Sequence, residues 1–167
     1  MKNTSKLFLI LIASVLLSFS MNAQQKMGYL ITEQLISELP AFKSANSQLE
    51  ALAGQFKKQL TDKENVIRQK VKEAEAKAPT LSPTQIKTIQ EDLAKDQQAL
   101  YADEKRYQQD LAKKEQELLD PIYNKVRTAI ESVAKNNGYS YILEGSSLMF
   151  ADDADDIMPL VKSQLGL

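Results

Sequence analysis

The sequence of 167 residues contains no cysteine, histidine or tryptophan and only five glycines. Without histidine or cysteine, the chain has no imidazole or thiolate to bind a metal, no thiolate nucleophile and no histidine-assisted serine triad. None of the glycines lies in a phosphate-binding loop. Pairs of Asp or Glu could still perform acid–base chemistry, but no pattern in the sequence builds a pocket around such a pair. We therefore predict that the protein is not an enzyme and that it uses no cofactor or metal.

The first 23 residues have the composition of a secretory signal peptide. Lys2 and Lys6 precede an almost unbroken apolar run, Leu7–Leu17, and a more polar exit ends at Ala23. An uncleaved membrane anchor is the alternative, but the apolar run is shorter than the ~20 residues that span a bilayer. We expect cleavage near Ala23 and export of a soluble mature chain, which has no cysteine for a lipid or a disulfide.

Two long stretches with helical periodicity dominate the mature chain, at residues 41–77 and 84–136. A single breaker with two prolines, residues 78–83, separates them. Each stretch carries a sparse apolar stripe, with a mean step of about 3.6 residues, on an otherwise polar surface. Two helices of this length with one hinge fold back on each other. We therefore predict a straight antiparallel α-helical arm over residues 41–120, with its turn at 78–83.

The turn also predicts which residues of the arm face each other. Folding about Thr80 pairs position i with position 161 − i, to within a few residues. That register places Gly54 opposite Tyr107 and Pro40 opposite Pro121. Because a proline within a helix removes a backbone donor, we expect a kink at Pro121, where the arm would join the rest of the protein.

The residues on either side of the arm, 24–40 and 121–167, are predicted to form a small β-rich body. The expected strands are Met27–Thr32, Ser140–Glu144 and Leu148–Ala151, of which the last two would form a hairpin around Gly145–Ser147. A short helix at Glu33–Leu39 and an amphipathic helix at Asp155–Leu165 complete the pattern. The predicted fold class is α+β and predominantly α.

This body is too small and too apolar to stand alone. Its ~65 residues are marginal for a single hydrophobic core without a disulfide. Its strands are apolar on both faces, so they need cover on two sides and partners at their edges. We therefore predict that the body oligomerises through the residues of its strands, namely Tyr29, Leu30, Ile31, Tyr141, Ile142 and Leu143.

Charge separates the arm from the body. Residues 42–136 contain seventeen Lys or Arg and fifteen Asp or Glu, whereas the rest of the mature chain has two basic and seven acidic residues. A mildly basic arm attracts acidic partners or anionic membrane surfaces at long range, so weak contact with a membrane surface is a further expectation. Most of these charges are expected to lie on a solvated face, and they are too dilute for nucleic-acid binding.

Two smaller groups of residues have a functional and a structural interpretation. The run Asp152–Asp156 resembles a cation site, but it lacks the glycine turn and distal glutamate of a calcium loop. Carboxylates just before a helix cap its free N–H groups, so capping is the favoured interpretation. Tyr101, Tyr107 and Tyr123 lie on or beside the apolar stripe, and we expect them to pack there instead of forming a ligand cage.

Several short motifs, in order along the chain, resemble the Skp/OmpH family of periplasmic chaperones. They are Gly28-Tyr-Leu-Ile-Thr32, Leu39-Pro-Ala-Phe-Lys43, Leu118-Leu-Asp-Pro-Ile-Tyr-Asn-Lys-Val126, Ala129-Ile130 to Val133-Ala134, Asn137-Gly-Tyr-Ser-Tyr-Ile-Leu143 and Asp155-Asp-Ile157. The resemblance covers the whole mature sequence, and the order and spacing of the motifs make it specific. One departure is that this arm is only weakly basic.

The resemblance implies a homotrimer in the periplasm, with a central β-body from which three helical arms surround a cavity. It also implies an ATP-independent holdase that keeps unfolded outer-membrane proteins in that cavity. The expected client-binding residues on the arm are Phe56, Leu60, Ile67, Val71, Leu81, Ile86 and Ile89, together with Lys57, Lys58, Lys63 and Lys70. A structural or adaptor protein of the cell envelope, with the hairpin as a spacer, is the alternative. Such a spacer would need a docking surface at the hairpin tip.

Overall fold

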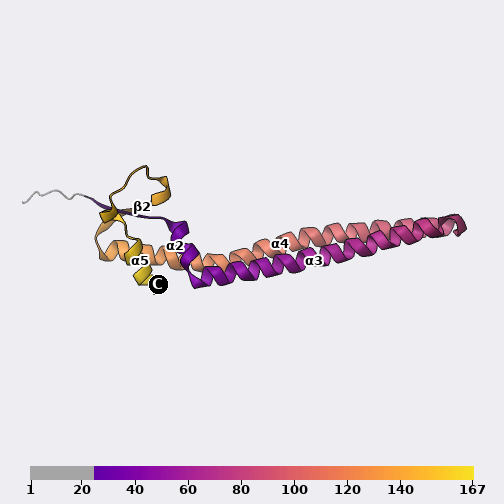
Figure 1. Ribbon diagram of the computed structural model, residues 1–167, viewed down its shortest axis with the longest axis horizontal. Coiled ribbons are helices and arrows are strands. Elements are labelled where there is room, and N and C mark those ends of the chain that lie inside the picture. Colours follow the sequence, from indigo (N-terminus) through magenta and orange to yellow (C-terminus); the bar gives the residue numbers. More distant parts are fainter. Residues whose placement is uncertain (1–24) are drawn as a thin grey trace, which may run out of the picture.

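The computed structural model describes residues 25–167 and shows a long helical hairpin on a small body (Figure 1). The elements are β1 (Lys26–Leu30), α2 (Thr32–Glu38), α3 (Pro40–Lys77), η1 (Ala78–Thr80), α4 (Pro83–Asn136), β2 (Tyr139–Glu144), η2 (Gly145–Ser147), η3 (Asp153–Asp155) and α5 (Met158–Leu165). The predicted signal peptide lies outside the described residues. Within the described range, no helix is both long and apolar enough to cross a membrane. The predicted α+β, predominantly α, fold class is confirmed.

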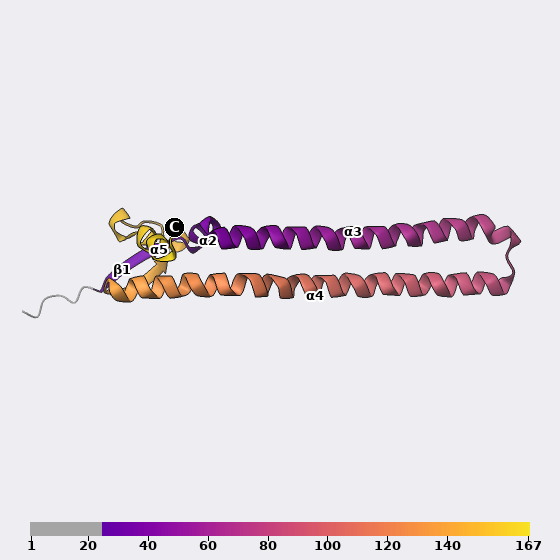
Figure 2. The same cartoon turned by 90° about the horizontal axis from the view of Figure 1, so that it is seen from below.

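The hairpin consists of α3, with 38 residues, and α4, with 54 residues, which run antiparallel (Figure 2). The turn ends where α4 is capped: the Ser82 hydroxyl accepts a hydrogen bond from the Gln85 N–H, and the Gln85 side chain accepts one from the Ser82 N–H. This reciprocal pair satisfies two donors that a helix start leaves free, and Pro83 at the first helical position suits the same geometry. Both helices begin within one residue of their predicted starts.

The register of the hairpin differs from the predicted one by about five residues. Three cross-helix contacts, Gln59–Tyr107, Lys63–Asp103 and Lys70–Asp96, each join positions whose numbers add to 166 instead of 161. The reason is that η1 continues the path of α3 before the chain crosses at Leu81 and Ser82, so the reversal is centred later than Thr80. As a result, Tyr107 meets Phe56, whereas a Cβ at Gly54 would have no neighbour within 4 Å. The register therefore moves Pro121 away from the level of Pro40, and α4 continues through Pro121 without a break.

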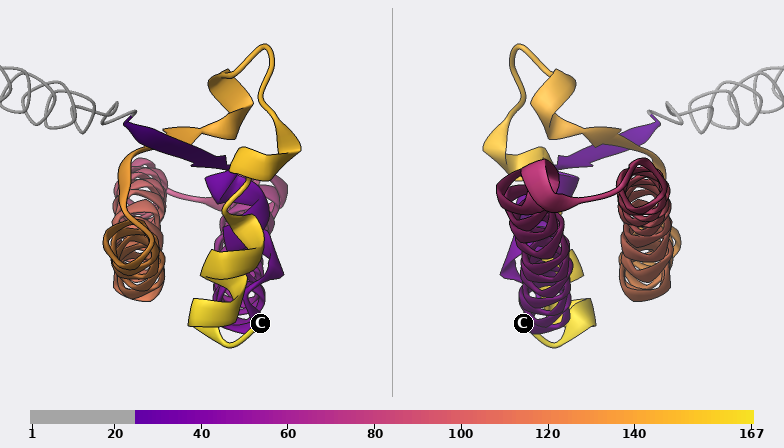
Figure 3. Two further views of the ribbon diagram at one scale, coloured as in Figure 1. Left: turned by 90° about the vertical axis from the view of Figure 1, so that its left-hand side faces the viewer. Right: turned by 90° about the vertical axis from the view of Figure 1, so that its right-hand side faces the viewer.

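The body is built on a parallel pair of strands. β1 and β2 pair from Met27↔Tyr141 to Leu30↔Glu144, and on its other side β1 bridges to Asp156, where the Ile157 N–H donates to the Tyr29 carbonyl at 2.9 Å. The view along the arm in Figure 3 shows α5 on one side of the strand pair and the loop after β2 on the other. Five side chains are fully buried where these elements meet: Leu30, Leu35, Val126, Ile157 and Val161.

Polar contacts tie the body together around this core. The Glu144 carboxylate, at the end of β2, accepts hydrogen bonds from the Thr32 N–H at 3.2 and 3.3 Å, at the start of α2. Burial raises the pKa of Glu144, but the hydrogen bonds from Thr32 and Ser146 outweigh it, so the net pKa is lowered. On α5, the Lys162 ammonium lies 2.6 Å from a Glu38 carboxylate oxygen. These contacts join segments more than 110 residues apart in the chain.

The predicted hairpin between β2 and Leu148–Ala151 is wrong. Gly145–Ser147 forms the 3-10 turn η2, and Leu148–Ala151 is not a strand. The side chains of Met149 and Phe150 are exposed, at 104% and 87%. The segment has the composition of a strand, but within the described residues β2 pairs with β1 alone, so this segment has no strand beside it. The last helix also starts later than expected, at Met158 instead of Asp155.

Candidate functional site

The apolar face shared by α3 and α4 is the candidate functional site, and we call it the seam. Among the described residues 46–118, Tyr107 alone is buried, and the other apolar side chains along the seam remain partly exposed. Val66 is 55% exposed and Ile86 is 36% exposed. A stripe of apolar side chains on a two-helix arm has no third element to cover it. The seam is therefore an elongated apolar surface open to solvent.

An aromatic pair holds the middle of the seam. The rings of Phe56 and Tyr107 stack with centroids 4.3 Å apart and planes at 5°. The Tyr107 hydroxyl donates a hydrogen bond of 2.5 Å to the Gln59 side-chain oxygen, and the Arg106 guanidinium lies 5.1 Å from the Tyr107 ring centroid. Stacked aromatic pairs contribute about 0.5–1.5 kcal/mol beyond their buried area. This cluster fixes the register of the two helices at mid-arm.

Two ion pairs join the helices farther toward the tip. The Lys63 ammonium pairs with the Asp103 carboxylate, and the Arg106 guanidinium on the same helix as Asp103 lies 2.7 Å from that carboxylate. The Lys70 ammonium lies 2.5 Å from an Asp96 carboxylate oxygen. The hydrogen bond from Lys63 lowers the pKa of the Asp103 carboxyl, and the hydrogen bond to Asp96 raises the pKa of the Lys70 ammonium. Lys63 and Lys70 are exposed, with side chains 48% and 51% accessible, so they lie on the solvated face as expected even though their ammonium groups reach carboxylates of the facing helix.

The other two lysines of the predicted set do not cross the seam. Lys58 pairs with Asp62 on its own helix at 2.8 Å, and its hydrogen bond to that carboxylate raises the pKa of Lys58. Lys57 is exposed. Both residues belong to the solvated surface of α3.

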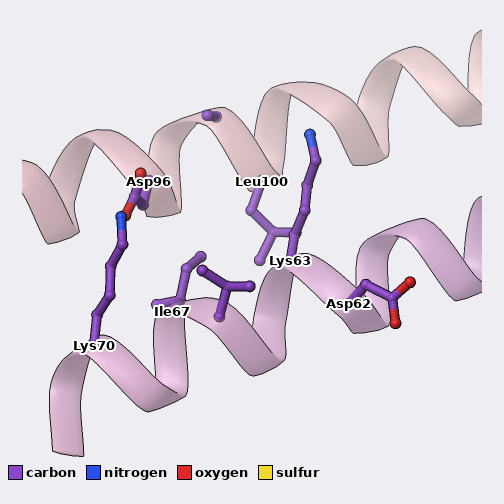
Figure 4. A pocket seen from close by; sticks show the side chains of 8 residues that line it. Asp62, Lys63, Ile67, Lys70, Asp96 and Leu100 are labelled. Atoms are coloured by element: carbon purple, nitrogen blue, oxygen red, sulfur yellow. The ribbon is translucent and has the colours of Figure 1, made fainter. Parts of the chain in front are cut away.

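A cavity of about 300 Å³ lies in the seam between the two cross-helix ion pairs (Figure 4). Four apolar side chains line it, namely Val66, Ile67, Ala99 and Leu100. Four charged residues at its edge bring both signs of charge, namely Asp62, Lys63, Lys70 and Asp96. The cavity thus combines an apolar surface with donors and acceptors at its rim.

Three further cavities lie along the arm. Toward the body, a cavity of about 410 Å³ is lined by Phe56, Leu60, Tyr107 and Leu111, among others. Toward the tip, cavities of about 210 and 230 Å³ are lined by Val71, Ala74, Leu81, Ile86, Ile89 and Leu93, among others. These volumes are at or below the low end of the range for small-molecule sites, and the cavities are open to solvent. They therefore suit single side chains better than a drug-sized ligand.

The seven apolar residues predicted to bind a client all line these cavities. They are Phe56, Leu60, Ile67, Val71, Leu81, Ile86 and Ile89. Sequence reasoning missed Val66, Ala99, Leu100 and the role of Tyr107. Leu100 and Tyr107 belong to the apolar stripe of α4, so a correct register would have placed them beside Ile67 and Phe56.

The strand residues predicted to mediate oligomerisation divide into two groups. Leu30 is buried in the core, and Tyr29 and Ile142 are half-buried. Ile31, Tyr141 and Leu143 are 37%, 53% and 40% exposed. Burial raises the pKa of the Tyr29 hydroxyl, and the negative charge of Asp156 raises it further. The exposed Met149 and Phe150 follow β2 after the polar turn η2.

The acidic run caps two short helices. The Asp152 carboxylate accepts a hydrogen bond from the Ala154 N–H at 2.9 Å, and Asp156 accepts one from the Met158 N–H at 2.8 Å. The capping interpretation is therefore confirmed. The expected packing of tyrosines holds for Tyr107, whereas Tyr101 and Tyr123 are 70% and 47% exposed.

Comparison with known proteins identifies the same architecture elsewhere. The chain is 21% identical over 143 residues to "Chaperone protein Skp" of Yersinia enterocolitica, covering 84% of this chain and 85% of that protein. It is 22% identical over 151 residues to the protein of the same name from Pectobacterium atrosepticum, covering 89% and 90%. An OmpH-like crystal structure from Caulobacter crescentus superposes with a TM-score of 0.75 at 20% identity, over 87% of this chain and 86% of that one.

The family pattern gives the more decisive match. The pattern described as "Outer membrane protein (OmpH-like)" matches residues 26–165, which is nearly all of the described chain. The resemblance to the Skp/OmpH family seen in the sequence is thereby confirmed. The protein belongs to the OmpH-like outer membrane protein family.

Proposed function

We propose that the protein is an ATP-independent holdase of the periplasm that binds unfolded outer-membrane β-barrel proteins. The observation that carries the proposal is the open apolar seam on a long polar arm, in a family whose relatives are named as chaperones. The signal-like first 23 residues support export, and no glycine-rich phosphate loop occurs in the sequence. On this proposal the protein is a binding protein and not an enzyme.

The physical basis of holding is many weak contacts. An unfolded β-barrel chain exposes apolar segments and unpaired strand edges, both of which drive aggregation. Partly exposed apolar side chains along the arm can bind such segments without a single deep pocket. Because each contact is weak, the client leaves when a more stable state becomes available. Nucleotide hydrolysis is therefore not needed for release.

A homotrimer with three arms around a shared cavity is part of the same proposal. The support lies in the body: Tyr141 and Leu143 are exposed on β2, which pairs only with β1 among the described residues. The neighbouring Leu148–Ala151 has strand composition but no strand beside it. A segment of one copy that pairs with the β2 edge of the next makes a head-to-tail contact, and such contacts generate a ring when the rotation between copies closes. The domain division into this body and an arm over 41–120 belongs to the proposal.

Replacing Tyr141 by Asp tests the assembly. A charge placed in an apolar strand interface is costly to desolvate, so the variant should lose the trimer in light scattering. Tyr101→Asp is the matched control, because Tyr101 is 70% exposed on the arm, and it should remain trimeric. A wild-type protein that is a stable monomer at micromolar concentration would refute the assembly.

The holdase activity is tested by diluting a denatured outer-membrane barrel protein into buffer without nucleotide. We expect the chaperone to suppress the rise in light scattering at near-stoichiometric amounts. If a folded protein gives no protection, the holdase proposal fails. The alternative role as a spacer or adaptor of the cell envelope would then explain the long hairpin.

A further inference from the structure

We propose that the client contacts one face of the arm, along an uncharged stripe on α4. The stripe consists of five exposed residues, namely Ile86, Gln90, Ala94, Gln97 and Tyr101. They recur every three or four residues, so they share one side of the helix. The inference rests on the proposed holdase function and specifies which surface of the arm meets the client.

The first support is that the two faces of the hairpin differ in their ion pairs. At about 100° per residue, Asp96 and Asp103 lie to one side of Leu100 on α4, and the stripe lies to the other side. The Lys63–Asp103 and Lys70–Asp96 pairs therefore cross the seam on the first side, which we call the bridged face. Figure 4 shows the Lys70 side chain reaching across to Asp96. We call the side with the stripe the open face, because no ion pair in residues 25–167 crosses the seam there. A client on the open face thus displaces no ion pair between the helices.

The second support is that the cavities on the two faces differ in charge. The bridged face holds the cavities of about 300 and 210 Å³, and half of the residues that line them are charged. The open face holds the cavities of about 410 and 230 Å³, and about a fifth of their lining residues are charged. Ile86 and Gln90 of the stripe line the smaller of these two, where Glu75 is the one charged lining residue. Because charged groups are costly to desolvate, the open face is the more favourable surface for an apolar chain.

The third support is the chemistry of the stripe itself. Tyr101 and Ile86, at its two ends, are large apolar side chains that are 70% and 36% exposed. Between them, the exposed Gln90 and Gln97 carry amide groups that both donate and accept hydrogen bonds. Such amides can pair with the backbone C=O and N–H groups of an unfolded chain whatever its sequence. Barrel strands alternate apolar and polar side chains, so apolar and uncharged polar groups of the stripe match both kinds.

The size of the stripe argues against a second copy of this chain as the occupant. From Ile86 to Tyr101, α4 advances 15 residues, or about 22 Å, and a helix with its side chains is ~10 Å wide. The stripe thus covers roughly 200 Å², whereas a stable protein interface buries ~800 Å² on each partner. A contact of this size fits a client that is held weakly and released without nucleotide.

Site-specific cross-linking on the full chain tests which face the client meets. A photoreactive phenylalanine analogue is placed at Ala94, on the stripe, or at Ala99, on the bridged face. These two alanines are a matched pair, because both are exposed on α4 and they lie about 140° apart around the helix. The client is a denatured outer-membrane barrel protein, and aggregation suppression is measured on both variants. We expect client cross-links at Ala94 at least several-fold above those at Ala99.

The outcomes separate this inference from the proposed function. Equal or stronger client cross-links at Ala99, with aggregation still suppressed, would overturn binding at the stripe and leave the holdase function standing. Cross-links at Ala94 between two copies of the chain, in place of client cross-links, would assign the stripe to self-association and also overturn it. Failure of the wild type and of both variants to suppress aggregation would remove the holdase function and binding at the stripe together.

Adding charge to the stripe provides a second measurement. The double variant Gln90→Glu, Gln97→Glu places two carboxylates on the stripe with little change of shape. Gln98→Glu with Gln109→Glu is the matched control, because it changes the net charge equally at exposed positions about 160–180° around α4 from Leu100. We expect the stripe variant to bind the client about tenfold more weakly than the control, since a carboxylate against an apolar chain loses hydration without a partner. Far-UV circular dichroism confirms that both variants remain helical. Equal client binding by the two helical variants would contradict the inference.

Discussion

Tyr107 should contribute more to the stability of the arm than any other side chain of its middle section. It is 8% exposed, it stacks on Phe56, and its hydroxyl donates to Gln59. A buried aromatic side chain removes about 150–250 Å² from water, which corresponds to about 4–6 kcal/mol at ~25 cal/mol per Å². Because the open seam can relax around the deletion, we expect Tyr107→Ala to cost about 3 kcal/mol, the lower end for aromatic deletions.

A second substitution separates the hydroxyl from the ring. Tyr107→Phe retains the stacking on Phe56 and removes the hydrogen bond to Gln59, so it should cost about 1 kcal/mol. Tyr101→Ala is the control, because Tyr101 is 70% exposed on the same helix, and it should change stability by no more than about 0.5 kcal/mol. The measurement is urea unfolding followed by circular dichroism at one protein concentration, since the stability of an oligomer depends on concentration.

The result that would refute this reasoning is equal destabilisation by Tyr107→Ala and Tyr101→Ala. It would mean that the aromatic pair does not hold the two helices in register. A loss for Tyr107→Phe as large as that for Tyr107→Ala would instead place the stabilisation in the hydrogen bond to Gln59.

Three further predictions follow from single contacts. Lys63→Asp should lower the thermal midpoint of the arm by placing two carboxylates together, and the swap Lys63→Asp with Asp103→Lys should recover most of the loss; no recovery would contradict the cross-helix pairing. Because the pKa of Asp103 is lowered in the folded protein, its stabilisation is present above its ordinary pKa of about 3.8 and is lost as the pH falls below it. Asp103→Asn should therefore weaken the fall of the thermal midpoint at acidic pH. Gly28→Ala should cost about 1–3 kcal/mol of stability, because the new Cβ would lie 2.8 Å from a methyl of Ile157. Gly54→Ala would have no neighbour within 4 Å, so it should stabilise α3 by about 1 kcal/mol. Urea unfolding measures both changes.

The long helices could be predicted from the sequence because their signals are local. The apolar periodicity, the prolines at Pro40 and Pro83 and the glycine at Gly138 each act within a few residues, and both helices begin within one residue of the predicted starts. Gly138 has a φ of 71°, which only glycine adopts readily, so the end of α4 was also encoded locally.

The register and the strand pairing could not be predicted in the same way. The register depends on how residues 78–82 reverse the chain, because the extra turn η1 shifts which side chains meet at Phe56 or Lys63. The partner of β2 is β1, more than 100 residues earlier, and no local signal connects them. For the same reason, the strand-like composition of Leu148–Ala151 suggested a hairpin that the chain does not form.

The position of the capping box at the tip has a consequence for the order in which the chain folds. Contacts near Ser82 close loops of a few residues, whereas those near the body close loops of more than a hundred, and closure entropy grows with loop length. Helix growth and short-loop closure take less than a microsecond. We therefore expect the arm to zip from its tip toward the body, with the Phe56–Tyr107 stack as a midway point. Once the arm has formed, it holds β1 and β2 close together in space. The pairing of these two strands, the most distant in the chain, then requires only a short-range docking step.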